Sequence, residues 1–173
     1  FYIMAYDFHK SRGEPGPNMP FGGFDELTTS KLRASPYDYS FQQMIEDFSE
    51  IIPPKNITVI FGMYGYDWTL GKQGLPLKQA VAVPLHEIEE GYDDCIVIPT
   101  NVEGSLDSLD STRDKSARDD KCIINTNPTS REKHITYTDD EGYDHVLWYE
   151  DEESANVKIE YLKEQGVGNV GYW

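Results

Sequence analysis

The chain has 173 residues and a formal net charge of −16. So acidic a chain is not expected to bind nucleic acid or an anionic membrane surface, because both would repel it. No apolar run reaches the length of a membrane span. A content of 38% hydrophobic residues, with 12 Tyr and 3 Trp, is typical of a folded domain. We therefore expect one domain with its own core, and either a neutral polysaccharide or a cationic partner.

The first part of the chain predicts two parallel strands joined by a helix. Residues 1–8 form a nearly continuous apolar run, as in a buried parallel strand, and residues 57–63 form a second one. A helix is expected between them, with Ser35 as its N-cap and Pro36 as its first residue, and Pro53 ends it. The right-handed crossover that such units adopt makes the two strands parallel.

The middle of the chain, residues 71–151, predicts a small inserted α+β region. A short helix is expected at residues 84–90 and a strand at residues 95–98. Alternating residues at 134–138 and 145–149, separated by an Asp-Asp-Glu-Gly turn, predict a hairpin.

The end of the chain returns to the first pattern. Ser154 is expected to open a final helix that Gly166 ends, and residues 167–173 read as a third buried strand. We therefore divide the chain into residues 1–70 with the first two strands, the inserted region, and residues 152–173 with the last helix and strand. Three parallel strands alone leave strand edges and one apolar sheet face uncovered, so we expect part of the fold to lie outside this chain.

The chain has two cysteines, Cys95 and Cys122, which flank the charged residues 103–121. We read these residues as a surface excursion. Two cysteines at the ends of one segment can form a disulfide in an oxidising compartment. No further soft ligand has metal-binding spacing, so we expect neither a metal nor another cofactor.

Aromatic and acidic residues follow the predicted parallel strands. Tyr6 and Asp7 end the first strand, residues 64–68 (Tyr-Gly-Tyr-Asp-Trp) end the second, and Trp173 ends the third. Ligands of parallel β/α folds bind at the carboxyl ends of the strands. Flat aromatic rings and carboxylates are the groups that contact sugars, although any single aromatic residue more often packs a core.

These residues carry a resemblance to a known family. Residues 4–7 (Met-Ala-Tyr-Asp) are similar to the Met-x-Tyr-Asp motif on the sixth barrel strand of the chitinase-like glycoside hydrolases of family 18. Residues 64–68 resemble the Tyr-Gly motif that ends the seventh strand. Residues 142–151, the following helix and the final Gly-Val-Gly-Asn-Val-Gly-Tyr-Trp resemble the bacterial branch with spore-germination and cortex-lytic hydrolases. The resemblance covers nearly the whole chain, least well between residues 87 and 133.

The resemblance implies an α/β fold: strands six to eight of a partial TIM (β/α)8 barrel with a small α+β insertion. A complete barrel takes roughly 250 residues, more than this chain has. The implied activity is hydrolysis of N-acetylglucosamine-containing β-1,4-glycans, chitin or peptidoglycan, by a substrate-assisted retaining mechanism. Tyr6 and Asp7 would be the catalytic residues: Tyr6 donates its hydroxyl to the substrate's acetamido group, and Asp7 binds the sugars about the scissile bond.

The resemblance also implies residues that bind the glycan. Trp173 would form the floor of the subsite that holds the distorted sugar ring, and Met4 would pack beneath the acetamido pocket. Tyr64, Tyr66 and Trp68 would line the wall of the cleft.

Two departures from the family pattern stand out. The family's proton donor ends an Asp-x-x-Asp-x-Asp-x-Glu motif on the fourth strand, and this chain has no such pattern. Tyr66 occupies the place where many chitinases have Arg after Tyr-Gly, which fits the bacterial branch. We therefore expect an enzyme when the barrel is complete and an inactive chain when these residues stand alone.

Two other readings stay open: a non-catalytic chitinase-like lectin or assembly module, and an independent small α/β domain. The expected partners are an N-acetylhexosamine polysaccharide or oligosaccharide and the remainder of the barrel, on the same or a second polypeptide. We expect an extracellular or cell-surface location.

Overall fold

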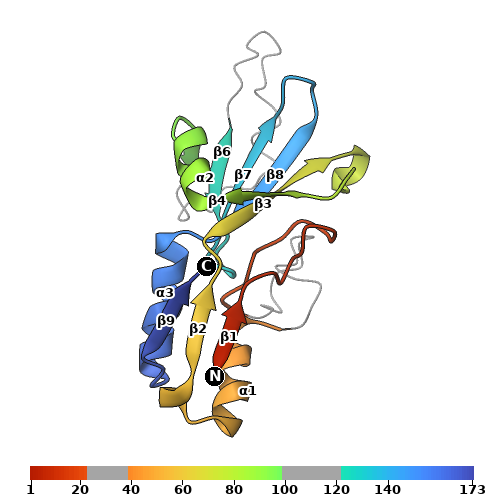
Figure 1. Ribbon diagram of the computed structural model, residues 1–173. Helices are drawn as coiled ribbons and strands as arrows, with labels where there is room; N and C mark the ends of the chain where they lie inside the picture. Colours follow the sequence, from red (N-terminus) through yellow and green to blue (C-terminus); the bar gives the residue numbers. More distant parts are fainter. Residues whose placement is uncertain (23–38, 99–121) are drawn as a thin grey trace.

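The computed structural model describes residues 1–22, 39–98 and 122–173. These residues form two sheets (Figure 1): a three-stranded sheet in the order β1-β2-β9 and a six-stranded sheet in the order β4-β3-β8-β7-β6-β5. The expected helix start at Ser35 and Pro36 and the segment 103–121 lie outside the described residues.

The three-stranded sheet contains the three buried strands that the sequence predicts, each shorter than expected. They are β1 (Tyr2–Ala5), β2 (Thr58–Phe61) and β9 (Asn169–Tyr172), and both strand pairs are parallel. The register pairs Ala5 with Phe61 and Phe61 with Tyr172. All three strands therefore end at one level, and their arrowheads in Figure 1 point toward the six-stranded sheet.

The first crossover helix, α1 (Phe41–Ile51), begins later than the sequence pattern suggests. Its N-cap is Ser40, whose Oγ accepts a 3.3 Å hydrogen bond from the backbone N–H of Gln43. The expected cap at Ser35 is thus wrong for this helix, because Ser40 supplies the same capping chemistry directly before the first apolar residue. The helix ends before Pro53, as expected.

The last helix, α3 (Glu152–Glu164), also has a different cap from the expected one. Asp151 is the N-cap, and Ser154 is the third helical residue. The two form a reciprocal capping box: the Ser154 backbone N–H donates to Asp151 Oδ1 at 2.9 Å, and Ser154 Oγ accepts from the Asp151 backbone N–H at 3.0 Å. Gly166 follows the helix with a φ of 77°, as expected of a glycine just past a helix end.

Both helices pack on one face of the three-stranded sheet. Alternate strand residues, such as Ile3 and Val59, are buried there against Phe41, Ile45 and other residues of the main core. The opposite face carries Tyr2 and Met4, which are 78% and 64% exposed. The sheet is therefore apolar on both faces, although only one face is covered within the described chain.

The six-stranded sheet holds most of the inserted region. Its strands are β3 (Tyr64–Leu70), β4 (Val81–Pro84), β5 (Ile96–Ile98), β6 (Ile123–Thr126), β7 (Lys133–Thr138) and β8 (Asp144–Tyr149). The helix α2 (Leu85–Gly91) packs on this sheet, and a short 3-10 turn at Lys72–Gly74 follows β3. A second 3-10 turn, at Pro54–Asn56, precedes β2.

The helix at α2, the strand at β5 and the β7–β8 hairpin are confirmed, whereas β4 and β6 were not predicted. Residues 64–68, expected to end the second buried strand, belong instead to a separate strand, β3. The chain passes from β2 into β3 within two residues, so the second sheet begins at Tyr64 and not after residue 70.

Candidate active site

Tyr6 and Trp173 lie at the carboxyl edge of the three-stranded sheet. Each directly follows its strand, and the shared register brings these ends together. The Trp173 backbone N–H donates to the Phe61 carbonyl at 2.8 Å, and its carbonyl accepts from the Met63 N–H at 3.0 Å. The Trp173 side chain is 79% exposed. The structure thus places both residues on one rim, as the sequence predicts.

Asp7 is the centre of a hydrogen-bonded cluster on this rim. Its Oδ1 accepts hydrogen bonds from the hydroxyls of Tyr64 and Tyr66, the second at 2.9 Å. Burial, together with the adjacent Asp7 carboxylate, raises the pKa of both tyrosines above that of an ordinary phenol. Both hydroxyls therefore stay protonated at neutral pH and hold the carboxylate in one orientation. No described residue donates a hydrogen bond to Oδ2, which suits this oxygen to accept from a ligand hydroxyl.

Tyr6 packs edge-on against Tyr64, with their ring centroids 6.1 Å apart. Gly62 makes this contact possible: a Cβ at that position would lie 2.5 Å from a Tyr64 ring atom and 2.8 Å from the Tyr6 Cβ. Tyr6 is half-buried, and its hydroxyl forms no hydrogen bond with another described residue. The rim thus offers one free phenolic donor beside a fixed carboxylate.

Asn18 holds the backbone of this rim, a role that no sequence motif indicates. Its Oδ1 accepts from the Asp7 backbone N–H at 2.8 Å, and its Nδ2 donates to the Gly62 and Tyr64 carbonyls at 3.2 and 3.4 Å. Asp7 has a φ of 61°, in the left-handed region that non-glycine residues rarely adopt. Asn18 thereby joins the ends of β1 and β2 to the start of β3.

Glu132, which is fully buried, fixes Asn18 in turn. Its two carboxylate oxygens accept hydrogen bonds from the backbone N–H groups of Asn18 at 2.6 Å and Met19 at 2.7 Å. Charge-assisted bonds of this kind are stronger than neutral ones. A residue 114 positions further along the chain therefore sets the loop that carries Asn18.

Glu132 belongs to a buried ion triad with Glu150 and Lys158. The Lys158 ammonium group on α3 contacts Glu132 at 3.0 Å and also binds Glu150. All three side chains are fully buried. Burial raises the pKa of Glu150 to about 8. The nearby Glu132 carboxylate also raises this pKa, whereas the Lys158 ammonium group lowers it. Burial by itself would lower the pKa of Lys158, but the two carboxylates outweigh it and raise that pKa.

The remaining predicted glycan-binding residues fall into two groups. Met4 lies on the uncovered sheet face. Tyr64 and Tyr66 lie at the rim, where their hydroxyls donate hydrogen bonds to Asp7. Trp68 is 0% exposed, packs against Trp148, and donates its indole N–H to the Gly13 carbonyl at 3.1 Å. The expectation that Trp68 lines the cleft is wrong, since a fully buried ring has no face left for a sugar.

The histidines serve packing and surface roles. His9, the one expected nearest the rim, is buried in the loop after β1 with Nδ1 3.0 Å from the Glu14 carbonyl. His134 stacks on Trp148, His145 contacts the Asp67 and Asp139 carboxylates, and His86 is exposed. Within the described ranges, no cluster of three or more His, Cys, Asp or Glu has metal-site geometry.

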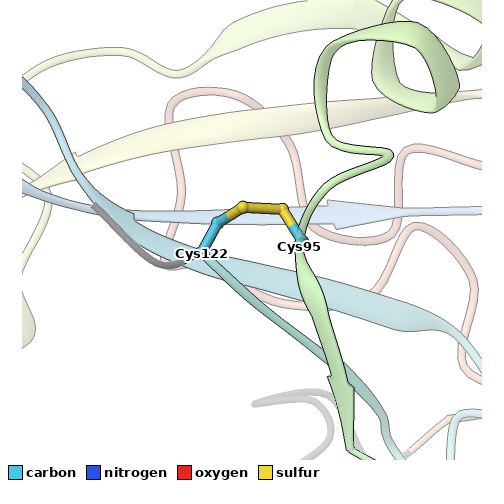
Figure 2. Close-up of a disulfide and its surroundings, with 2 residues drawn as sticks. All are labelled: Cys95 and Cys122. Atoms are coloured by element: carbon cyan, nitrogen blue, oxygen red, sulfur yellow. A yellow bond between two sulfur atoms is a disulfide. The ribbon is translucent and has the colours of Figure 1, made fainter. Parts of the chain in front are cut away.

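Cys95 and Cys122 form the expected disulfide. Figure 2 shows the two sulfur atoms joined between the segments that lead into β5 and β6, which pair in parallel. The disulfide closes a separation of 27 residues at the edge of the six-stranded sheet. No helix in the described part of the chain has the length and apolar character needed to cross a bilayer.

Comparison with known proteins places this geometry in a family. The family described as glycosyl hydrolases family 18 matches residues 1–173. The chain is 27% identical to the cortical fragment-lytic enzyme of Bacillus anthracis over 173 residues, which is 99% of this chain and 30% of that protein. It thus spans about 30% of the length of the first curated relatives that it matches.

Solved structures show the same fold. The putative sporulation-specific glycosylase YdhD of Bacillus subtilis superimposes with a TM-score of 0.68 at 22% identity, covering 99% of this chain and 42% of that one. The chitinase of Cycas revoluta, solved in complex with (GlcNAc)3, gives a TM-score of 0.58 at 20% identity, covering 99% and 41%. The match over its whole length shows that the chain belongs to family 18 of the glycosyl hydrolases.

Proposed function

We propose that the protein containing this chain hydrolyses N-acetylglucosamine-containing β-1,4-glycans, of the chitin or peptidoglycan type, by substrate-assisted retaining catalysis. The observation that carries the proposal is the rim itself. Tyr6, Asp7 and Trp173 gather at the carboxyl edge of three parallel strands in a family 18 chain. Relatives named for cortical fragment lysis and as a di-N-acetylchitobiase support glycans that contain N-acetylhexosamine.

The three parallel strands would be strands six to eight of a (β/α)8 barrel, with the six-stranded sheet as its insertion. The uncovered face with Tyr2 and Met4 supports this arrangement, because it would face the barrel interior. The outer edges of β1 and β9 support it too: no other described strand pairs with them, and a closed barrel leaves no such edges. The remaining strands would come from the same or a second polypeptide.

In this mechanism the substrate supplies the nucleophile. Its acetamido oxygen attacks the anomeric carbon, the bond to the leaving oxygen breaks, and that oxygen takes a proton from a general acid elsewhere in the barrel. Tyr6 would donate its free hydroxyl to the acetamido group and stabilise the oxazolinium-like intermediate, which water then opens with retention. Asp7, held by Tyr64 and Tyr66, would accept from the sugar through Oδ2.

The other contacts would set the sugar's position. Trp173 would supply a floor for the distorted ring through its exposed indole, and Met4 would pack beneath the acetamido methyl group. Tyr64 and Tyr66 would form the wall beside Asp7.

These 173 residues alone would have little activity, because they contain no Asp-x-x-Asp-x-Asp-x-Glu motif. Loss of general acid catalysis typically costs about a hundred- to ten-thousand-fold in rate. A lectin or assembly module is the alternative, and it would bind glycans without cleaving them. The disulfide supports an extracellular or cell-surface location, since disulfides persist in oxidising compartments.

The experiment uses the protein expressed from its complete coding sequence. Two chromogenic disaccharides are compared, one with a 2-acetamido group and one with a hydroxyl in its place. We expect cleavage of the first alone, with the β-anomer as the initial product by NMR. Equal cleavage of both would overturn the substrate-assisted mechanism, and binding without cleavage would favour the lectin.

A further inference from the structure

A pocket of about 370 Å³ lies outside the rim, where the loop after β1 meets the segment between β3 and β4. It is lined by Arg12, Gly13, Glu14, Pro76, Leu77, Lys78 and Gln79. Three hydrogen bonds join its two walls: Arg12 Nε to Gln79 Oε1 at 3.3 Å, Gln79 Nε2 to Ser11 Oγ at 3.1 Å, and the Ala80 N–H to the Ser11 carbonyl at 2.7 Å. The pocket is therefore built by two segments that hold each other in place through these hydrogen bonds.

The pocket is positively charged in a strongly acidic chain. Residues 10–14 and 71–79 contain Lys10, Arg12, Lys72 and Lys78, with Glu14 as their one acidic residue. None of the four cations forms an ion pair with a described residue, whereas Lys133, Lys158 and Lys163 all do. The net charge of the chain is −16. A local excess of unpaired positive charge in such a chain favours binding of an anionic group.

The pocket is connected to the proposed active site through two aromatic side chains. The Gly13 carbonyl in its wall accepts from the indole of Trp68, and the Trp68 ring lies 5.7 Å from the Tyr66 ring. Tyr66 in turn donates to Asp7 at 2.9 Å. The pocket and the rim are therefore joined by one chain of side-chain contacts along β3.

The lip of the pocket is apolar. Leu75 and Leu77 are each 56% exposed, and Leu77 lines the pocket. An exposed apolar lip beside two free cations suits a short substituent that has both a methyl group and a carboxylate.

We propose that this pocket binds a carboxylate attached to the glycan, through Arg12 and Lys78, with the O-lactyl group of an N-acetylmuramic acid unit as the fitting substituent. The preferred substrate is then a peptidoglycan-type glycan and not uncharged chitin. This inference rests on the proposed function, because it assumes that a glycan occupies the rim.

The test measures calorimetric affinity of the protein from its complete coding sequence for three glycans. The probes are chitotetraose, a tetrasaccharide of alternating N-acetylglucosamine and N-acetylmuramic acid, and that tetrasaccharide with its lactyl groups capped by peptide stems. The variant is Arg12→Gln/Lys78→Gln. The matched control is Lys55→Gln/Arg131→Gln, which removes the same charge from two exposed cations away from the pocket.

We expect the wild-type protein to prefer the lactyl tetrasaccharide over chitotetraose. The pocket variant should lose on the order of fivefold in affinity for it at low salt and nothing for chitotetraose, and the control should match the wild type. Binding of the peptide-bearing glycan alone, sensitive to the pocket variant, would assign the carboxylate to the peptide.

Equal affinity for charged and neutral glycans, unchanged in the pocket variant, would overturn the pocket's role while leaving the proposed function intact. Absence of binding to all three glycans would overturn both.

Discussion

Asn18 accepts a 2.8 Å hydrogen bond from the backbone N–H of Asp7 and so fixes that residue in its left-handed conformation. The same amide donates to the Gly62 and Tyr64 carbonyls, so one side chain connects three strand ends. The proposed catalytic carboxylate is therefore positioned by a buried residue of the loop after β1.

Replacing this side chain should weaken both the fold and the site. Asn18→Ala leaves buried backbone groups without partners, so we expect a loss of about 1–3 kcal/mol in the free energy of unfolding, together with weaker binding of chitotetraose. Urea unfolding and calorimetry measure the two effects. Asn169→Ala, which removes an exposed amide bonded to the Lys55 carbonyl, is the control and should change stability by less than about 0.5 kcal/mol. Equal effects of the two substitutions would contradict the role of Asn18.

The buried triad predicts a large effect at Lys158. Lys158→Met leaves the carboxylates of Glu132 and Glu150 buried without their cation, and breaking a buried pair in this way typically costs about 3–5 kcal/mol. Urea unfolding measures it. Lys163→Met on the same helix removes a lysine paired with Glu160 at the exposed surface and should be nearly neutral. A Lys158→Met protein as stable as the control would show that the triad contributes nothing.

The raised pKa of Glu150 predicts a pH dependence of stability. Its folded-state pKa of about 8 lies above the ordinary value of 4.5, so the folded state binds the proton more tightly. The resulting stabilisation is complete below pH 4.5 and is lost as the pH rises through about 8. Between pH 6.5 and 8.5 the free energy of unfolding should therefore fall, by on the order of 1 kcal/mol, and Glu150→Gln should flatten this slope.

This window avoids the opposing effect of His134, whose pKa burial lowers to about 4. Stability linked to His134 is present above pH 6.5 and is lost as the pH falls toward 4. A slope above pH 6.5 that persists unchanged in Glu150→Gln would assign the titration to another group.

The disulfide should stabilise the six-stranded sheet. Loop-closure entropy for a separation of 27 residues predicts about 3–4 kcal/mol. Thermal melting of Cys95→Ser/Cys122→Ser should thus show a clear decrease in Tm, and reductant should lower the Tm of the wild type without affecting the variant. Identical melting with and without reductant would contradict a stabilising disulfide.

The parallel sheet could be predicted from the sequence because its strands consist mainly of apolar residues, and at least one face of the sheet is buried. Residues 1–8, 57–63 and 167–173 are apolar runs for this reason, and the helix before Gly166 has clear end signals. The β3 strand was missed because Tyr64 follows the end of β2 after two residues, so one continuous run conceals a change of sheet.

The rim residues of the site were predictable from strand ends, but their support was not. Asn18 and Glu132 are 114 residues apart, and neither has a neighbouring motif, so only the folded chain brings them together. Trp68 shows the opposite error: an aromatic residue in a family-like motif is buried under the Gly13 loop.

The central claim concerns the Tyr6 hydroxyl, and Tyr6→Phe tests it most directly, because the substitution keeps the ring that packs against Tyr64. In the protein from its complete coding sequence, we predict that Tyr6→Phe lowers kcat on chitotetraose by about 100- to 1,000-fold, the usual effect of losing one donor to a developing charge. Tyr143→Phe, the same change at an exposed residue of the turn between β7 and β8, should leave kcat unchanged. Undiminished hydrolysis by Tyr6→Phe would contradict the account.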